Sequence, residues 1–164
     1  MSNKPNELKT KSTRKRGFEV VVSDKKKHAI DIKLPVRSDD GSAGYDFYSP
    51  ESVEISPGEK ETIWTDVKSY MEKDEVLKIY PRSSMGIKFG VSLANTTGII
   101  DSSYYENPDN DGNIGICIIN NSKETYFVSK EDRIGQGIFQ KFLVADNDDV
   151  LNEERLSGIG HSGR

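Results

Sequence analysis

Short runs in which apolar residues alternate with polar ones recur along most of the chain, and turn residues separate them. Alternation with a period of two is typical of β-strands with one buried face, whereas amphipathic helices have a period near 3.6. Because helical periodicity is nearly absent, the pattern favours an all-β sandwich or barrel. Strands are predicted at residues 18–22, 29–34, 53–59 (ending in a Pro-Gly turn), 62–67, 76–80, 114–119, 125–128 and 131–140, with 142 and 144 finishing the sheet.

The strand pattern is interrupted at Pro81, which ends a strand and precedes a short predicted helix. Ser83 or Ser84 can cap this helix, whose first N–H groups have no partner within the helix. Arg82 and two hydroxyls beside such a helix start would suit a phosphate group. An ordinary serine cap beside a surface arginine explains the same residues equally well.

The 164 residues suit one domain, which composition divides into three parts. Residues 1–27 hold nine basic and three acidic side chains, a charge of +6, and are predicted to be a flexible extension. The remainder holds 23 − 9 = 14 bases and 27 − 3 = 24 acids, a charge of −10. Residues 28–150 are the predicted β domain and residues 151–164 a glycine-rich flap. The acidic body argues against general nucleic-acid binding and is compatible with a magnesium-dependent site.

Other features exclude several classes of protein. No run of eighteen apolar residues exists, so no membrane span is predicted, and without a signal-peptide core the expected location is cytoplasmic. Two histidines make a multi-histidine zinc centre a poor fit. Cys117 lies in an apolar run and is predicted to be a buried strand residue. The polar stretch 105–113 lacks the glutamate spacing of an EF-hand.

Candidate chemistry concentrates at residues 95–104. Asp101 ends an apolar strand, Tyr104 follows three residues later, and Asn95 precedes the aspartate by six. These residues offer a base, an aromatic platform and an amide that can read a polar edge. An ordinary Asp-Ser-Ser turn is the competing interpretation.

Three further places carry weaker signals. Asp46 follows small residues that let the backbone approach a ligand, although it can also be a surface charge. Gln136 lies between glycines, where it can reach a ligand or simply face solvent. The glycines, serines and arginines of residues 155–164 suit a flap over phosphates or an ordinary chain end.

Taken together, five stretches in order resemble the homotrimeric dUTPases, the dUTP nucleotidohydrolases. Each stretch alone is a weak signal, but five in order are specific. The resemblance extends over roughly residues 28–164. The matching stretches are residues 43–47, 81–86, 95–104, 133–138 and 155–163.

The resemblance implies a jelly-roll-like β fold and a homotrimer with three shared active sites that hydrolyse dUTP to dUMP and pyrophosphate with Mg²⁺. By this resemblance, Asp101 activates the attacking water, Tyr104 packs under the deoxyribose and excludes a 2′-hydroxyl, and Asp46 helps hold magnesium through water. The implied substrate-binding residues are Arg82, Ser83, Ser84, Gly86, Asn95, Gly98, Ile100, Tyr104, Gln136, Arg155, Gly158, Ile159, Gly160, His161 and Ser162.

Two positions depart from the family pattern. Glu106 stands where the family usually has glycine, and an insertion at residues 105–111 delays the glycine to Gly112. Ile159 stands where a phenylalanine usually stacks on uracil. Loss of that stacking is expected to weaken the closed state by roughly 0.5–1.5 kcal/mol, about two- to tenfold in affinity.

Two alternatives compete with the hydrolase. A related dCTP deaminase would need a glutamate base where this chain has Asp101. A phage-type regulatory protein would use the fold to bind another protein, through the insertion at 105–111 or the basic extension.

Overall fold

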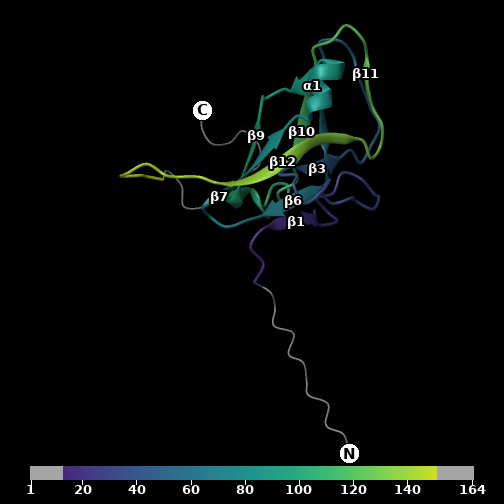
Figure 1. The fold of residues 1–164 in the computed structure, drawn as a ribbon. Helices are drawn as coiled ribbons and strands as arrows, with labels where there is room; N and C mark the ends of the chain where they lie inside the picture. Colours follow the sequence, from purple (N-terminus) through teal and green to yellow (C-terminus); the bar gives the residue numbers. More distant parts are fainter. Residues whose placement is uncertain (1–12, 151–164) are drawn as a thin grey trace, which may run out of the picture.

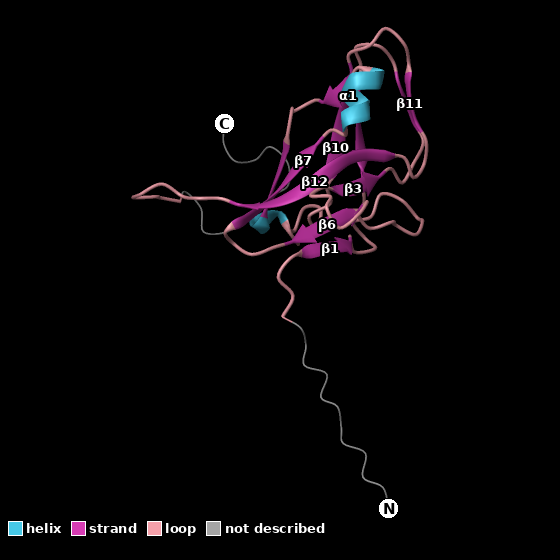
Figure 2. Cartoon of the chain, viewed as in Figure 1, coloured by secondary structure: helices cyan, strands magenta, loops and turns pink. Residues whose placement is uncertain are grey.

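A computed structural model describes residues 13–150 of the chain, and these residues are mostly β-strand (Figure 2). One α-helix and one 3₁₀ turn interrupt the strands. In chain order the elements are β1 (Gly17–Val20), β2 (Val36–Arg37), β3 (Tyr45–Tyr48), β4 (Val53–Ile55), β5 (Lys60–Trp64), β6 (Val67–Tyr70), β7 (Glu75–Tyr80), α1 (Ser83–Phe89), β8 (Val91–Leu93), β9 (Gly98–Asp101), η1 (Ser102–Tyr104), β10 (Gly115–Asn120), β11 (Tyr126–Val128) and β12 (Arg133–Lys141).

Antiparallel pairing joins these strands into four small sheets. The largest has the order β2-β3-β12-β7-β9, and a second has the order β5-β10-β8. The pairs β1-β6 and β11-β4 complete the set. In Figure 1, β12 crosses the middle of the molecule, with α1 and β11 at one end and β1 and β6 at the other.

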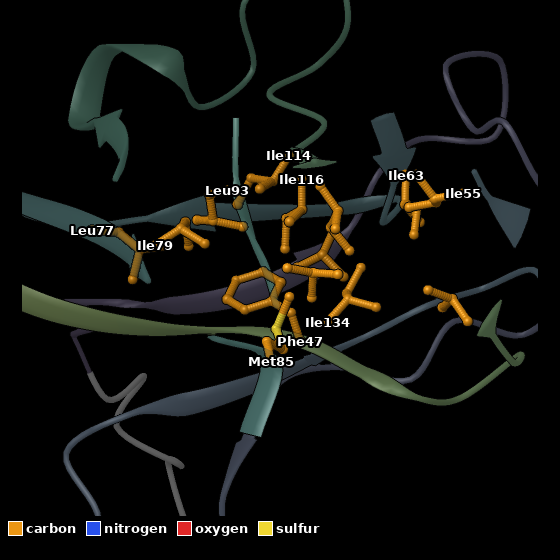
Figure 3. Packing of buried hydrophobic residues seen from close by; sticks show 14 of the residues in the cluster. Phe47, Ile55, Ile63, Leu77, Ile79, Met85, Leu93, Ile114, Ile116 and Ile134 are labelled. Atoms are coloured by element: carbon orange, nitrogen blue, oxygen red, sulfur yellow. The ribbon is translucent and has the colours of Figure 1, made fainter. Parts of the chain in front are cut away.

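The hydrophobic core lies between the two larger sheets (Figure 3). Phe47 and Leu77 come from the five-stranded sheet, and Ile63 and Ile118 come from the three-stranded one; all four are fully buried. Met85 of α1 closes the core at one end and is 2% exposed. The alternating apolar residues therefore form the buried face of each sheet, as the sequence predicted.

The predicted all-β class is confirmed, and so are most strands and the helix after Pro81. Residues 29–34 were expected to form a strand, but this stretch is irregular in the structure. Burial still alternates along this stretch, since Ile30 and Ile32 are half-buried and the residues between and beside them are exposed. The sheet ends at Lys141 and not at Val144, which is 67% exposed. Within the described residues no helix has the length and apolar character needed to span a membrane.

The predicted strand at 62–67 is two strands, because the chain bends at Asp66. This residue has φ +55° and is fully buried. Its carboxylate accepts hydrogen bonds from the backbone N–H groups of Lys27 and His28 and from the side-chain amide of Asn113, each at 2.8 Å. The ring of His28 also lies 2.8 Å from it. Several hydrogen bonds to one buried carboxylate compensate for both its burial and the strained backbone.

The predicted boundary of the flexible extension at residue 27 is wrong for its last part. β1 pairs along its whole length with β6. Phe18 packs edge-on against Tyr45 and Phe47, with ring centroids 5.3 and 5.5 Å apart. Val21 is 2% exposed. Charge alone suggested an extension, but these apolar residues anchor the segment to the body.

Replacing Phe18 with alanine tests this anchoring. We expect Phe18→Ala to lower the free energy of unfolding by about 2 kcal/mol, less than for a fully buried phenylalanine because Phe18 is half-buried. Urea denaturation measures the change. Val22→Ala is the matched control, since Val22 is 46% exposed and is expected to cost under about 0.5 kcal/mol. Equal effects of the two variants would contradict the anchoring.

Candidate active site

A cavity of about 480 Å³ opens where β9 faces β8, β10 and β5. Four of the residues predicted from sequence meet in its wall: Asn95, Gly98, Ile100 and Tyr104. A largely apolar cavity of this size with a few polar groups is typical of small-molecule sites. We call it the β9 cavity; it is lined by Lys60, Thr62, Ile79, Leu93, Ala94, Asn95, Gly98, Ile99, Ile100, Tyr104, Gly115, Ile116 and Cys117.

The turn between β8 and β9 shapes one wall of this cavity. The chain turns at Thr96, which has φ +67° and whose N–H donates to the carbonyl of Leu93 at 3.1 Å. Gly98 then lies against Ile79, where an added Cβ would come within 3.0 Å of the isoleucine Cβ. Asn95 and Gly98, on either side of this turn, both line the cavity.

Asp101 ends β9 and directly follows Ile100, which lines the cavity. Its side chain is exposed, and its extended backbone leads into η1. Tyr104 at the end of η1 is 4% exposed. The end of β9 thus places one carboxylate directly after a residue of the cavity wall, and η1 places one aromatic ring in the wall itself.

A second group of predicted residues lies around the start of α1. The carboxylate of Asp46 is 6% exposed and forms ion pairs with Arg82 at 3.0 Å and with Arg133 at 3.4 Å. Gln136 donates a hydrogen bond to the carbonyl of Pro81 at 3.1 Å. Two guanidinium groups held by one carboxylate leave a net positive site that suits phosphate oxygens. We call Asp46, Arg82, Arg133 and Gln136 the cationic group.

Burial raises the pKa of Tyr126, and the nearby negative charge of Asp132 adds to this while the positive charge of Arg82 opposes it. The phenol therefore stays neutral beside the cationic group.

The serine cap predicted for the helix is wrong. Arg82 occupies the N-cap position and makes no side-chain capping hydrogen bond, while Ser83 is already the first helical residue. Because capping does not use them, the hydroxyl of Ser83 is exposed and that of Ser84 half-exposed beside Arg82. Gly86 lies further along the helix and is exposed.

Asp101 and the residues around the start of α1 lie toward opposite ends of β7. Asp101 is opposite Val76 in the β7–β9 ladder, whereas Gln136 is opposite Tyr80 in the β7–β12 ladder. Arg82 follows two residues after Tyr80. At about 3.4 Å per residue, six residues separate Asp101 from Arg82 by roughly 20 Å along the strand. One chain therefore does not bring its carboxylate at the cavity to its own cationic group.

The described residues do not fit a metal centre built from protein ligands. No three His, Cys, Asp or Glu side chains converge anywhere in residues 13–150. Asp46, the predicted outer contact of a magnesium ion, is occupied by its two arginines. Oxygen ligands for Mg²⁺ would have to come mainly from a bound phosphate chain and water.

Sequence reasoning missed several residues of both groups. Thr62 and Cys117 line the β9 cavity from neighbouring strands, and Arg133 shares Asp46 with Arg82. Strand alternation could have shown which face of its own strand Thr62 or Cys117 occupies. It could not have shown that the two residues are neighbours, because their register joins strands more than fifty residues apart.

Comparison with known proteins finds similar proteins along most of the chain. The family model described as dUTPase matches residues 30–163. The deoxyuridine 5′-triphosphate nucleotidohydrolase of Lactococcus lactis subsp. lactis (strain IL1403) is 46% identical over 149 residues, covering 90% of this chain and 97% of that protein. The enzyme of the same name from vaccinia virus (strain Copenhagen) is 39% identical over 135 residues, covering 80% and 86%.

This chain belongs to the dUTPase family.

Solved structures of the dUTPase family agree with the jelly-roll-like fold predicted from the sequence. The crystal structure of the Streptococcus mutans dUTPase superposes with a TM-score of 0.71 at 38% identity, covering 79% of this chain and 98% of that one. The dUTPase from phage phi11 of S. aureus has the same fold, with a TM-score of 0.67 at 22% identity and coverage of 85% and 97%.

One departure from the dUTPase pattern has a structural explanation. Glu106, at the position where the family usually has glycine, keeps a left-handed backbone with φ +54°. Lys68 binds its carboxylate at 3.3 Å. The glycine conformation is thus retained without glycine, at a cost of roughly 1–2 kcal/mol, and the insertion then closes at Gly112, which has φ +84°.

The predicted flap lies outside the described residues. Its predicted substrate contacts therefore remain predictions; they are Arg155, Gly158, Ile159, Gly160, His161 and Ser162.

A methyl group at Gly44 tests the cationic group. An added Cβ there would lie 2.5 Å from Oε1 of Gln136, so the glutamine must move and lose its bond to Pro81. We expect Gly44→Ala to weaken binding of inorganic pyrophosphate about three- to tenfold with little change in melting temperature. Isothermal titration calorimetry measures this. Gly41→Ala, whose Cβ makes only an ordinary 3.4 Å contact, is the control; equal affinity in both variants would remove Gln136 from the site.

Proposed function

We propose that this protein hydrolyses dUTP to dUMP and pyrophosphate. The observation that carries the proposal is the β9 cavity, in which Asn95, Gly98, Ile100 and Tyr104 meet beside Asp101. Membership of the dUTPase family and 46% identity to a deoxyuridine 5′-triphosphate nucleotidohydrolase support it.

The β9 cavity takes the nucleoside. Asn95 and the exposed backbone near Gly98 offer polar groups to the uracil edge, and Ile100 contributes an apolar wall. Tyr104 lies under the deoxyribose, where its buried ring leaves no room for a 2′-hydroxyl. Rejection by a fixed ring is steric, so it can discriminate sharply against UTP.

Asp101 activates the water. Its carboxylate accepts a proton from water as the water oxygen bonds to the α-phosphorus, and the bond to the bridging oxygen breaks to release pyrophosphate. The exposed position of Asp101 at the end of β9 leaves it accessible to water and substrate. Positioning and charge stabilisation supply most of the rate enhancement in such a displacement.

The cationic group takes the phosphates. Arg82, Ser83 and Gln136 bind phosphate oxygens, with Ser84 and Gly86 behind them on α1. A magnesium ion would be held mainly by phosphate oxygens and water, because the described residues do not supply its ligands, and it would offset part of the phosphate charge. Asp46 orients Arg82 and Arg133, and its water-mediated contact with the ion stays a prediction.

Three copies complete the site between them. The carboxylate and the cationic group of one chain are roughly 20 Å apart along β7, so each copy supplies only one half of a given site. Beyond β12 the chain projects away from the body (Figure 1, yellow), with Leu143 97% and Val150 74% exposed. Apolar side chains in such an extension favour packing against a neighbouring copy. Residues 155–162 of a neighbour then close over the triphosphate.

The alternatives have less support. A dCTP deaminase lacks support because the similar proteins are nucleotidohydrolases and Asp101 occupies the base position. Most of the polar side chains at 105–113 that a docking protein would need are engaged within the chain. A cytoplasmic location and the lack of a nucleic-acid partner remain predictions.

Pyrophosphate release tests the reaction and its base together. With Mg²⁺ present, we expect release from dUTP and not from dCTP, dTTP or UTP, and we expect Asp101→Asn to lower kcat by at least about a hundredfold because the base is lost. Retained binding of a non-hydrolysable dUTP analogue by the variant is the control for folding. Ammonia release from dCTP would instead indicate the deaminase, and no release from any nucleotide would favour a regulatory protein.

Mixed assemblies test the shared site. Asp101→Asn and Arg82→Ala chains are expected to be inactive alone, but co-refolded chains should regain roughly a quarter of the wild-type sites, because some sites pair an intact Asp101 with an intact Arg82 from another copy. Light scattering should give the mass of a trimer. A monomer mass, or no recovery in verified mixed trimers, would overturn the shared site.

A further inference from the structure

The insertion at residues 105–111 holds Tyr104 at both ends. At the backbone, the carbonyl of Tyr104 accepts hydrogen bonds from the side-chain amide of Asn107 at 2.8 Å and from its N–H at 3.4 Å. At the other end, Asn110 donates its amide N–H to the Tyr104 hydroxyl at 2.8 Å. The hydroxyl in turn donates to the carbonyl of Asn113 at 2.7 Å. The ring that lines the β9 cavity is thus fixed from behind by the insertion.

The amide of Asn110 is itself fixed in orientation. Its oxygen accepts from the side chain of Asn107 at 2.8 Å and from the N–H of Gly112 at 3.1 Å. With both acceptor bonds made, the nitrogen must point toward Tyr104. Asn107 is 4% exposed, and its own oxygen accepts from the N–H groups of Asp109 and Asn110. A fully satisfied network of this kind is rigid.

The insertion is also tied to the body of the fold. Lys68 is 4% exposed and binds Asp111 at 3.0 Å and Glu106 at 3.3 Å. Burial alone would lower the pKa of Lys68, but its bonds to these two carboxylates outweigh burial and raise it. The N–H of Val22 donates to Asp111 at 2.8 Å, and Tyr105 donates to Glu19 on β1. Both ends of the insertion are thereby anchored.

We propose that Asn110 is a positioning residue which holds the Tyr104 ring in the β9 cavity and so sets the discrimination between deoxyribonucleotides and ribonucleotides. The proposal rests on the proposed dUTP hydrolysis and deepens it. Steric rejection of a 2′-hydroxyl works only while the ring cannot tilt away. Tyr104 has its apolar face at the cavity and its hydroxyl in the insertion, so the bond from Asn110 resists that tilt. In this proposal the insertion acts on the β9 cavity of its own chain, through Tyr104.

The experiment compares kcat/KM for dUTP and UTP in four proteins: wild type, Asn110→Ala, Tyr104→Phe and the double variant. Both single variants break the hydrogen bond between Asn110 and Tyr104, and Tyr104→Phe also removes the bond from the hydroxyl to Asn113. We expect each to lower the dUTP/UTP ratio of kcat/KM about three- to tenfold. The double variant should lower it no further than Tyr104→Phe alone, because residues that act through one contact are not additive.

Asn121→Ala is the matched control, since this exposed asparagine follows β10, donates its side-chain amide to Ser92 on β8 and not to the insertion or Tyr104, and should leave the ratio unchanged. A purely structural role for Asn110 would lower the melting temperature and both rates while leaving the ratio intact, and that result would overturn the proposal. An Asn110→Ala effect of full size in the Tyr104→Phe background would also overturn it. If Asn110→Ala does not fold, the test is the dUTP/UTP ratio of kcat/KM in Tyr104→Phe, and an unchanged ratio there would overturn the proposal. A wild-type protein that hydrolyses no dUTP would instead refute the proposed function.

Discussion

The pairing of β7 with β9 on one side and β12 on the other is the constraint on which the site depends. Hydrogen-bond registers fix Asp101 at the Val76 end of this strand and Gln136 at the Tyr80 end. Antiparallel ladders are stiff and extended, so the roughly 20 Å between Asp101 and Arg82 cannot be closed by side-chain motion. A single chain therefore does not bring its own Asp101 and Arg82 together, which is the basis of the proposed shared site.

Polar networks, together with the apolar core, hold the parts of the chain next to the site. Asp66, Lys68 and Asn113 are buried or nearly so, and each forms hydrogen bonds or ion pairs with several neighbours. In residues 13–150 no buried side-chain nitrogen or oxygen lacks a hydrogen-bond partner. Because an unpaired buried polar group costs more than a made hydrogen bond contributes, such networks specify one geometry. That specificity suits the proposed role of the β9 cavity in excluding a 2′-hydroxyl.

Sequence patterns predicted most of the strands but failed at particular places. Alternation identified residues 29–34 correctly as having two faces, yet a strand also needs a partner strand, which periodicity does not report. The bend at Asp66 depends on donors from residues 27, 28 and 113, which are far away in the chain. For the site, the order of motifs indicated Asn95, Asp101 and Tyr104, whereas Arg133, Thr62 and Cys117 were missed.

By itself, the sequence determined the all-β class, the family and the identities of the chemical groups, because alternation and short motifs are encoded in neighbouring residues. Only the tertiary structure decided which groups meet. It pairs Asp46 with two arginines, gathers Asn95 and Tyr104 around one cavity, and turns the insertion inward onto Tyr104. These contacts depend on strand registers and on satisfaction of buried polar groups, which arise when distant segments pack together.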